Sequence, residues 1–206
     1  MTQQRLVFIG DSITEWGRFE DPLDLGDNYV RIIRDLLAIE SPEMFPEIIN
    51  KGIGGNRISD LAERWQEDVI ALNPDWLSIS IGINDVWRQL DNPDMEQIYP
   101  DQFERIYDQL LKEVKNQTDA TIILMEPTII EEEIHSRGNE LLKAYLEATH
   151  RLAEKYACIL VPTHKAFLDV LATGLDVPLT IDGVHMSSTG NQLMAKTWLE
   201  TVTLFK

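Results

Sequence analysis

Short apolar runs rich in valine and isoleucine alternate with longer segments of helical spacing, and this alternation restricts the fold more than any other feature of the chain. Most of the short runs are continuously apolar, as strands are when both faces of a sheet are covered. Strands that alternate with helices form right-handed β-α-β units. The pattern therefore predicts an α/β protein with a three-layer α/β/α sandwich. The predicted strands are residues 6–9, 48–49, 76–81, 121–125 and 158–161.

The segments between the strands repeat apolar residues every three or four positions, so each would bury one stripe of a helix. The predicted helices are residues 29–39, 58–72, 103–114, 141–156 and a last one from Ser188. Either Ser187 or Ser188 is expected to cap the last helix, because serine is a favoured cap. Two acidic, proline-containing segments, 17–27 and 91–100, are expected to cross the surface as loops. Ser78 and Ser80 give the third strand a polar face, which we expect to meet small neighbours.

The length and the charge of the chain limit its organisation and its partners. A length of 206 residues predicts a single domain spanning residues 1–206. The net charge is −17, and so acidic a surface repels phosphate backbones and anionic lipid heads. Nucleic acids and membranes are therefore not expected partners, whereas a small neutral or cationic substrate is.

The cysteine content and the N-terminal sequence indicate the cellular compartment of the protein. The single cysteine, Cys158, cannot form an internal disulfide and is predicted to be buried in an apolar run. No secretory signal is visible, and no apolar stretch reaches the roughly 18 residues of a spanning helix. These features predict a cytoplasmic protein.

Polar, mostly glycine-bearing segments follow the first four predicted strands. They are residues 10–12, 50–56, 82–85 and 126–128, and a further polar segment, 182–185, precedes the last helix. In an open parallel sheet, ligands bind beyond the carboxyl ends of the strands. The sequence therefore predicts that these segments gather at one edge of the sheet.

The gathered segments contain the groups that acyl transfer needs. Ser12 is the predicted nucleophile, and because a serine hydroxyl is weakly nucleophilic it needs a base, predicted to be His185. Asp182 is expected to orient the imidazole and stabilise its cation. The predicted oxyanion donors are the backbone N–H groups of Ser12 and Gly55 and the side-chain amide of Asn84.

Each of these residues also has a structural interpretation. Ser12 is a plausible cap of a first helix, and Asn84 a plausible turn residue. Residues 52–55 are rich in glycine, but they lack the spacing of a phosphate-binding loop. The joint occurrence of all four segments favours the catalytic interpretation.

Four short motifs occur in order along almost the whole chain and resemble those of the SGNH (GDSL-type) hydrolases. They are Gly10-Asp11-Ser12-Ile13, Asn50-x-Gly52-x-x-Gly55, Gly82-x-Asn84-Asp85 and Asp182-x-x-His185. Ile13 departs from the leucine that is commoner at its position, and both side chains are apolar. The resemblance implies a flavodoxin-like five-stranded parallel sheet of order 2-1-3-4-5, a Ser–His–Asp triad, and no metal or cofactor.

A narrower resemblance, to intracellular acetylxylan esterases, rests on three further segments. They are residues 64–70, 73–76 and 82–89. This resemblance implies a small acyl pocket, an acetylated saccharide as substrate and a homo-oligomer. Four residues are candidates for contacting that substrate: Asp11, Trp16, Arg57 and Trp87. A structural role is the alternative for each of them.

Other residues and other functions are the alternatives to this interpretation. Residues 131–135 hold three glutamates and His135 but lack a second histidine at ligand spacing, so they predict a solvated acidic loop or helix start and no metal site. His150 and His164 are expected on helix surfaces. The alternative functions are a lipase, lysophospholipase or thioesterase for longer acyl chains, a non-catalytic sugar- or lipid-binding module, and an FMN-binding protein.

Overall fold

A five-stranded parallel sheet organises residues 4–203, the part of the chain that the computed structural model describes. Its strand order is β2-β1-β3-β4-β5, with every neighbouring pair parallel. The strands are β1 (Arg5–Gly10), β2 (Glu47–Gly52), β3 (Trp76–Ser80), β4 (Thr121–Met125) and β5 (Ile159–Val161). The predicted sheet and its order 2-1-3-4-5 are confirmed.

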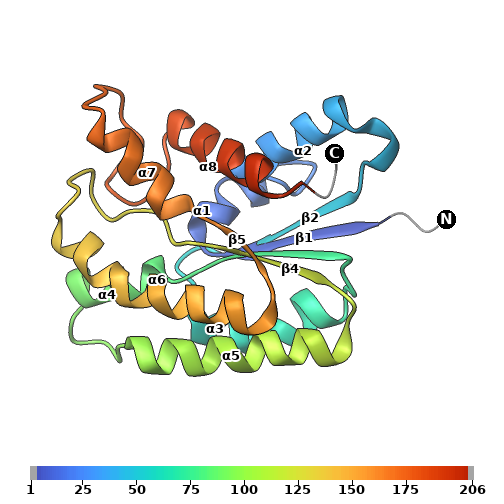
Figure 1. The fold of residues 1–206 in the computed structure, drawn as a ribbon, viewed down its shortest axis with the longest axis horizontal. Coiled ribbons are helices and arrows are strands. Elements are labelled where there is room, and N and C mark those ends of the chain that lie inside the picture. The colour runs from blue at the N-terminus through green and yellow to red at the C-terminus, as the bar shows by residue number, and fades with distance from the viewer. Residues whose placement is uncertain (1–3, 204–206) are drawn as a thin grey trace.

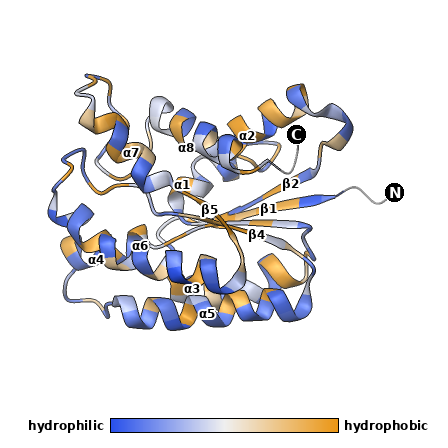
Figure 2. Cartoon of the chain, viewed as in Figure 1, coloured by the Kyte–Doolittle hydropathy of each residue, from blue (hydrophilic) through white to orange (hydrophobic). Residues whose placement is uncertain are grey.

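Helices cover both faces of the sheet, as Figure 1 shows. One layer holds α2, α7 and α8, and the other holds α3 to α6. The helices are α1 (Ser12–Glu15), α2 (Tyr29–Glu40), α3 (Ile58–Trp65), α4 (Ile83–Asp91), α5 (Pro100–Gln117), α6 (Arg137–Tyr156), α7 (Thr163–Ala172) and α8 (Ser188–Thr201), with short 3-10 turns at Arg18–Glu20 and Pro42–Met44. Figure 2 shows apolar strands between helices whose polar residues face outward. The predicted α/β/α sandwich is therefore confirmed.

The central strands are buried on both faces, which explains why their sequences read as continuous apolar runs. Leu6 to Ile9 have no exposed surface, and β3 is buried along its whole length. The polar face of β3 meets a small neighbour, as predicted, only at Ser80, which pairs with Gly10 of β1. Ser78 instead accepts a hydrogen bond of 3.1 Å from the indole nitrogen of Trp198 in α8.

Several elements differ from the helical pattern read from the sequence. The helices α4 and α7 lie outside the predicted helical ranges, because each is short. The predicted helix 58–72 ends at Trp65, and Gln66–Ile70 continues as a π-helical segment. Residue 91 belongs to α4, so the predicted loop 91–100 begins one residue later. Ser187, not Ser188, caps α8, because its hydroxyl accepts the Gly190 N–H.

The burial of Cys158 is less complete than predicted. Cys158 is partly rather than fully buried, and this burial raises the pKa of its thiol to about 11. No helix among residues 4–203 is long and apolar enough to cross a membrane.

Gly190, in the first turn of α8, packs against the segment that leads to residues 182–185. A methyl group added there would overlap the carbonyl oxygen of Leu179. We expect Gly190→Ala to lower the free energy of unfolding by about 1–3 kcal/mol, because backbone has to move. Urea unfolding measures this, with the exposed neighbour Thr189→Ala as the control. Equal stability of the two variants would contradict the close approach.

Candidate active site

Ser12 lies where β1 ends and α1 begins. The preceding residue, Asp11, caps this helix by accepting the Ile13 N–H at 3.0 Å, so Ser12 is not the cap. The Ser12 hydroxyl is left to bond with His185, and its Oγ lies 2.9 Å from Nε2 of the ring. The two residues are 173 positions apart in the sequence.

A tight hairpin presents Asp182 and His185 to Ser12. Thr180 and Met186 form an isolated antiparallel bridge, and the Ile181 N–H donates to the carbonyl of His185 at 2.8 Å. Asp182 Oδ1 accepts the backbone N–H of His185 at 2.8 Å, while Oδ2 lies 2.7 Å from Nδ1 of the ring. A carboxylate only accepts, so Nδ1 carries the ring proton and Nε2 is free to accept the proton of Ser12.

The charge of Asp182 is stabilised within this hairpin. Partial burial pushes the pKa of Asp182 upward, but hydrogen bonds from the His185 ring and from the N–H groups of His185 and Val184 outweigh it. The pKa therefore lies below its ordinary value. Asp182 is ionised at neutral pH and can stabilise an imidazolium cation.

Glu131 and Glu132 form hydrogen bonds with the hairpin that carries Asp182 and His185. Glu132 Oε1 accepts the N–H groups of Leu179 and Thr180, at 2.9 and 2.6 Å, and the hydroxyl of Thr180 at 2.6 Å. The Glu131 N–H donates to the carbonyl of Gly183 at 2.7 Å. Residues 131–135 form a mostly exposed acidic loop, as predicted, and this segment also anchors the His185 hairpin. Among the described residues, no group of three or more His, Cys, Asp or Glu is arranged to hold a metal ion.

Gly55 and Asn84, the predicted oxyanion donors beside Ser12, come from the turn after β2 and from the start of α4. Gly55 has a φ of +77°, which favours glycine, and open space surrounds the position a Cβ would take. A Cβ on the adjacent Gly54 would contact that of Ser12 at 3.8 Å, so this turn borders Ser12. Asn84 is buried in the first turn of α4, and its Nδ2 donates to the carbonyl of Asn56 at 3.1 Å. One N–H of this amide is left for a ligand.

Arg64 ties these loops to the sheet, a role that sequence reasoning missed. Its guanidinium donates to the carbonyls of Gly10 and Lys51, at the ends of β1 and β2, and to Oδ1 of Asn56. Arg64 lies in α3, outside the polar segments that follow the strands. Its only signal in the sequence is its place in residues 64–70, one of the segments that resemble acetylxylan esterases.

Two of the four candidate substrate residues lie against the imidazole of His185. The ring of Trp16 is centred 4.9 Å from that of His185, and the ring of Trp87 is centred 5.8 Å from it at a steep angle. Trp16 is 37% exposed, which leaves part of its ring open to a ligand. Arg57 lies at the start of α3 and donates to the carbonyl of Glu96.

Asp11 is buried, and its contact with substrate stays a prediction. Its burial raises the pKa of the carboxyl group to about 7, against the lowering effects of the Ile13 N–H and of the nearby His185 and Arg64. The alternative, a structural role within the loop, agrees with its capping hydrogen bond.

The other two histidines named in the sequence differ in exposure. His150 lies on the surface of α6 as predicted, and its Nε2 is 2.6 Å from Oε1 of the buried Glu126. The surface prediction for His164 is wrong, because the ring is buried and Nδ1 bonds with the carbonyl of Thr128.

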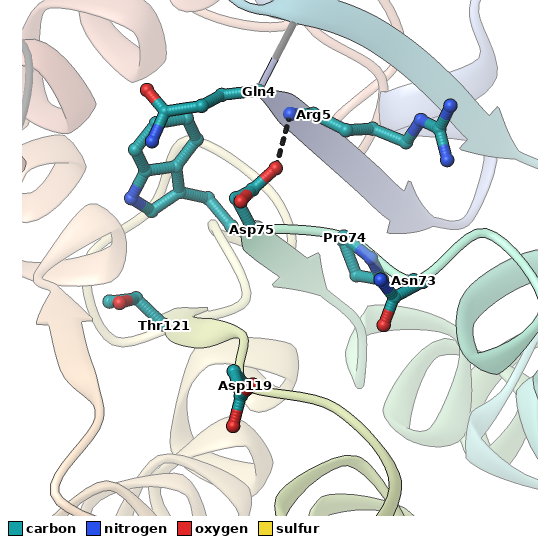
Figure 3. Close-up of a pocket in the computed structure, with 8 residues that line it drawn as sticks. Gln4, Arg5, Asn73, Pro74, Asp75, Asp119 and Thr121 are labelled. Carbon is teal, nitrogen blue, oxygen red and sulfur yellow. Dashed lines mark hydrogen bonds between the residues drawn. The ribbon is translucent and has the colours of Figure 1, made fainter. Parts of the chain in front are cut away.

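A polar hollow of about 540 Å³ lies at the opposite edge of the sheet, at the amino ends of β1, β3 and β4 (Figure 3). Asp75 accepts the backbone N–H of Arg5 there at 2.7 Å. The hollow is lined by residues 4–5, 73–76, 119 and 121 and contains none of the predicted site residues. The reactive groups are all at the carboxyl edge, where parallel sheets bind ligands.

A three-layer sandwich with a serine, a histidine and an aspartate joined at its carboxyl edge defines a serine ester hydrolase of the flavodoxin-like type. The profile of the GDSL-like Lipase/Acylhydrolase family matches residues 8–193, and the chain belongs to that family. It is therefore a carboxylic ester hydrolase, and the binding-module and FMN-binding alternatives are wrong.

Relatives with solved structures cover nearly the whole chain. An acetylxylan esterase from Geobacillus stearothermophilus is 39% identical, over 97% of this chain and 94% of that one. A crystal structure of an acetylxylan esterase from this organism has a TM-score of 0.88 at 38% identity, with the same coverage. An α/β hydrolase from the metagenome of Lake Arreo, Spain, has a TM-score of 0.91 at 33% identity, covering 98% of this chain and 96% of that one. Catalytic mutants of the Geobacillus enzyme replace a serine, an aspartate or a histidine by alanine.

Proposed function

We propose that this esterase removes acetyl groups from xylo-oligosaccharides or other acetylated carbohydrates, with Ser12, His185 and Asp182 as its catalytic triad. The observation that carries the proposal is the continuous hydrogen-bonded relay from Ser12 Oγ to Nε2 and from Nδ1 to Asp182, at 2.9 and 2.7 Å. The catalytic serine, aspartate and histidine of the Geobacillus relative support this assignment.

In the proposed reaction, Ser12 Oγ attacks the acetyl carbonyl carbon while His185 Nε2 takes its proton. The N–H groups of Ser12 and Gly55 and the amide of Asn84 donate to the resulting oxyanion. His185 then protonates the sugar alkoxide as the C–O bond breaks, which leaves an acetyl group on Ser12. Water, deprotonated by His185, attacks this acetyl-enzyme and releases acetate and free Ser12.

The carbohydrate assignment rests on the relatives and on the surroundings of His185. The Geobacillus enzyme is described as an acetyl-xylooligosaccharide esterase. Trp16 and Trp87 offer flat apolar rings beside the triad, on which a sugar ring can stack. An uncharged saccharide also meets no repulsion from a chain of net charge −17.

A series of p-nitrophenyl esters from acetate to decanoate tests the acyl-chain preference. We expect kcat/KM to fall steeply beyond acetate, because a small acyl pocket excludes longer chains. Detection of acetate released from acetylated xylo-oligosaccharides tests the sugar. A plateau of kcat/KM at long chains, with no acetate released from the saccharides, would contradict this and support the lipase, lysophospholipase or thioesterase alternative.

Three expectations about the whole molecule also stay predictions. Residues 1–206 are expected to unfold as one domain, which differential scanning calorimetry tests as a single transition. A homo-oligomer is expected from the resemblance to acetylxylan esterases, and light scattering measures its mass. A cytoplasmic location is tested by cell fractionation.

A further inference from the structure

The oxyanion donors of the proposed function come from two separate segments, and their spacing has to be fixed. Gly55 belongs to the turn after β2, whereas Asn84 belongs to the first turn of α4, after β3. Donors stabilise an oxyanion only when they are held in place before charge develops. A group that joins the two segments would therefore control the rate.

Asp85, which follows Asn84, makes such a connection. It has no exposed surface, and both of its carboxyl oxygens lie 3.3 Å from the backbone nitrogen of Ile58, the first residue of α3. Asn84 in turn donates to the carbonyl of Asn56 at 3.1 Å. Asn84 and Asp85, which are adjacent in α4, thus hydrogen-bond to the backbone of Asn56 and Ile58. These two backbone groups flank residue 57 and follow Gly55 closely in the chain.

We propose that Asp85 is a positioning residue of the oxyanion pocket, whose carboxyl group holds the start of α3 against the start of α4 and so fixes Gly55 relative to Asn84. This inference rests on the proposed function of those two donors. Asp85 itself acts through the backbone and through Asn84, and it does not take part in the chemistry.

The surroundings of Asp85 favour the uncharged form. Burial, with a smaller effect of the nearby Asp11, raises the pKa of Asp85 to about 8 against the lowering effects of the Ile58 N–H and the charge of Arg57. Tyr145 of α6 interacts electrostatically with this carboxyl group, and the Gln89 amide donates to the backbone carbonyl of Asp85 and to the Tyr145 hydroxyl. Loss of the proton above pH 8 would place a negative charge beside Asn84, where it opposes the oxyanion.

Two variants of Asp85 separate its hydrogen bond from its charge. Asp85→Asn keeps an acceptor for Ile58 but cannot ionise, so we expect kcat at pH 7 to stay within a few-fold of wild type. Asp85→Ala removes the connection, and we expect kcat to fall about 10–100-fold with little change in KM, because the donors move apart. Asp60→Ala is the control: Asp60 caps the same turn of α3 through the Arg57 N–H but does not reach α4.

The pH profile is a second readout that a merely structural role would not change. We expect kcat of the wild type to fall above about pH 8 and kcat of Asp85→Asn to stay level there. Between pH 3.8, the ordinary pKa of an aspartate, and about pH 8, Asp85 keeps its proton in the folded protein, whereas it loses the proton in the unfolded chain. Wild-type stability therefore declines with rising pH in this window. The Tm of Asp85→Asn relative to wild type should accordingly rise from pH 4 to pH 8.

Specific outcomes would overturn the inference. One is an equal loss of kcat at pH 7 in Asp85→Asn and Asp85→Ala, and another is an alkaline decline that Asp85→Asn retains. A third is a loss of kcat in Asp60→Ala as large as that in Asp85→Ala, which would trace the effect to the stability of α3. Failure of the proposed function would be recognised separately, because Ser12→Ala would then remain active.

Discussion

Replacing Ser12 by alanine is expected to reduce kcat for p-nitrophenyl acetate by about 10⁴–10⁶-fold. The reason is that no other nucleophile accepts the acetyl group, so only binding and oxyanion stabilisation remain. His185 keeps its bond to Asp182 in this variant, and KM is expected to change little. Initial rates at saturating ester, corrected for spontaneous hydrolysis, measure the loss.

Labelling by a serine-directed organophosphate tests the same residue without a substrate. Wild type is expected to bind one equivalent per chain and Ser12→Ala none, because an unactivated serine does not react. Ser188→Ala removes an exposed serine at the start of α8 and is the matched control, with labelling and kcat both unchanged. Labelling of Ser12→Ala, or hydrolysis near the wild-type rate, would refute the triad.

Replacing Asn84 by alanine is expected to lower kcat by about 10²–10³-fold, the usual effect of losing one oxyanion donor. Because this hydrogen bond is made mainly in the transition state, KM should change little. Asn84 is buried, and a donor shielded from water acts more strongly on developing charge. Asn92→Ala, at the exposed end of α4, is the control and should keep full activity.

The kinetic pattern of Asn84→Ala distinguishes two roles. A fall in kcat without a rise in KM supports a transition-state donor. A rise in KM at constant kcat would instead assign Asn84 to substrate binding and contradict the proposed oxyanion pocket. Because the variant also loses the bond to Asn56, a thermal unfolding curve should accompany the rates.

Much of the architecture could be predicted from the sequence, because burial on both faces leaves a direct mark on a strand. The continuous apolar runs located all five strands of the sheet, and the motif resemblance supplied their order. Elements with weak periodicity were missed, such as α7, which lies partly exposed at the edge of the layer. The surface prediction for His164 failed because helical spacing does not reveal which neighbour covers a side chain.

The sequence by itself determined which reactive groups this protein carries and that they stand at the ends of strands or next to a helix, since local patterns encode strands, helices and turns. Only the tertiary structure decided that Asp11 is buried, that Glu132 anchors the His185 hairpin, and that Asp85 connects α4 to α3. The physical reason is that these roles depend on contacts between segments distant in sequence. Burial and hydrogen-bond partners, which set the charge and orientation of a side chain, exist only after the chain has folded.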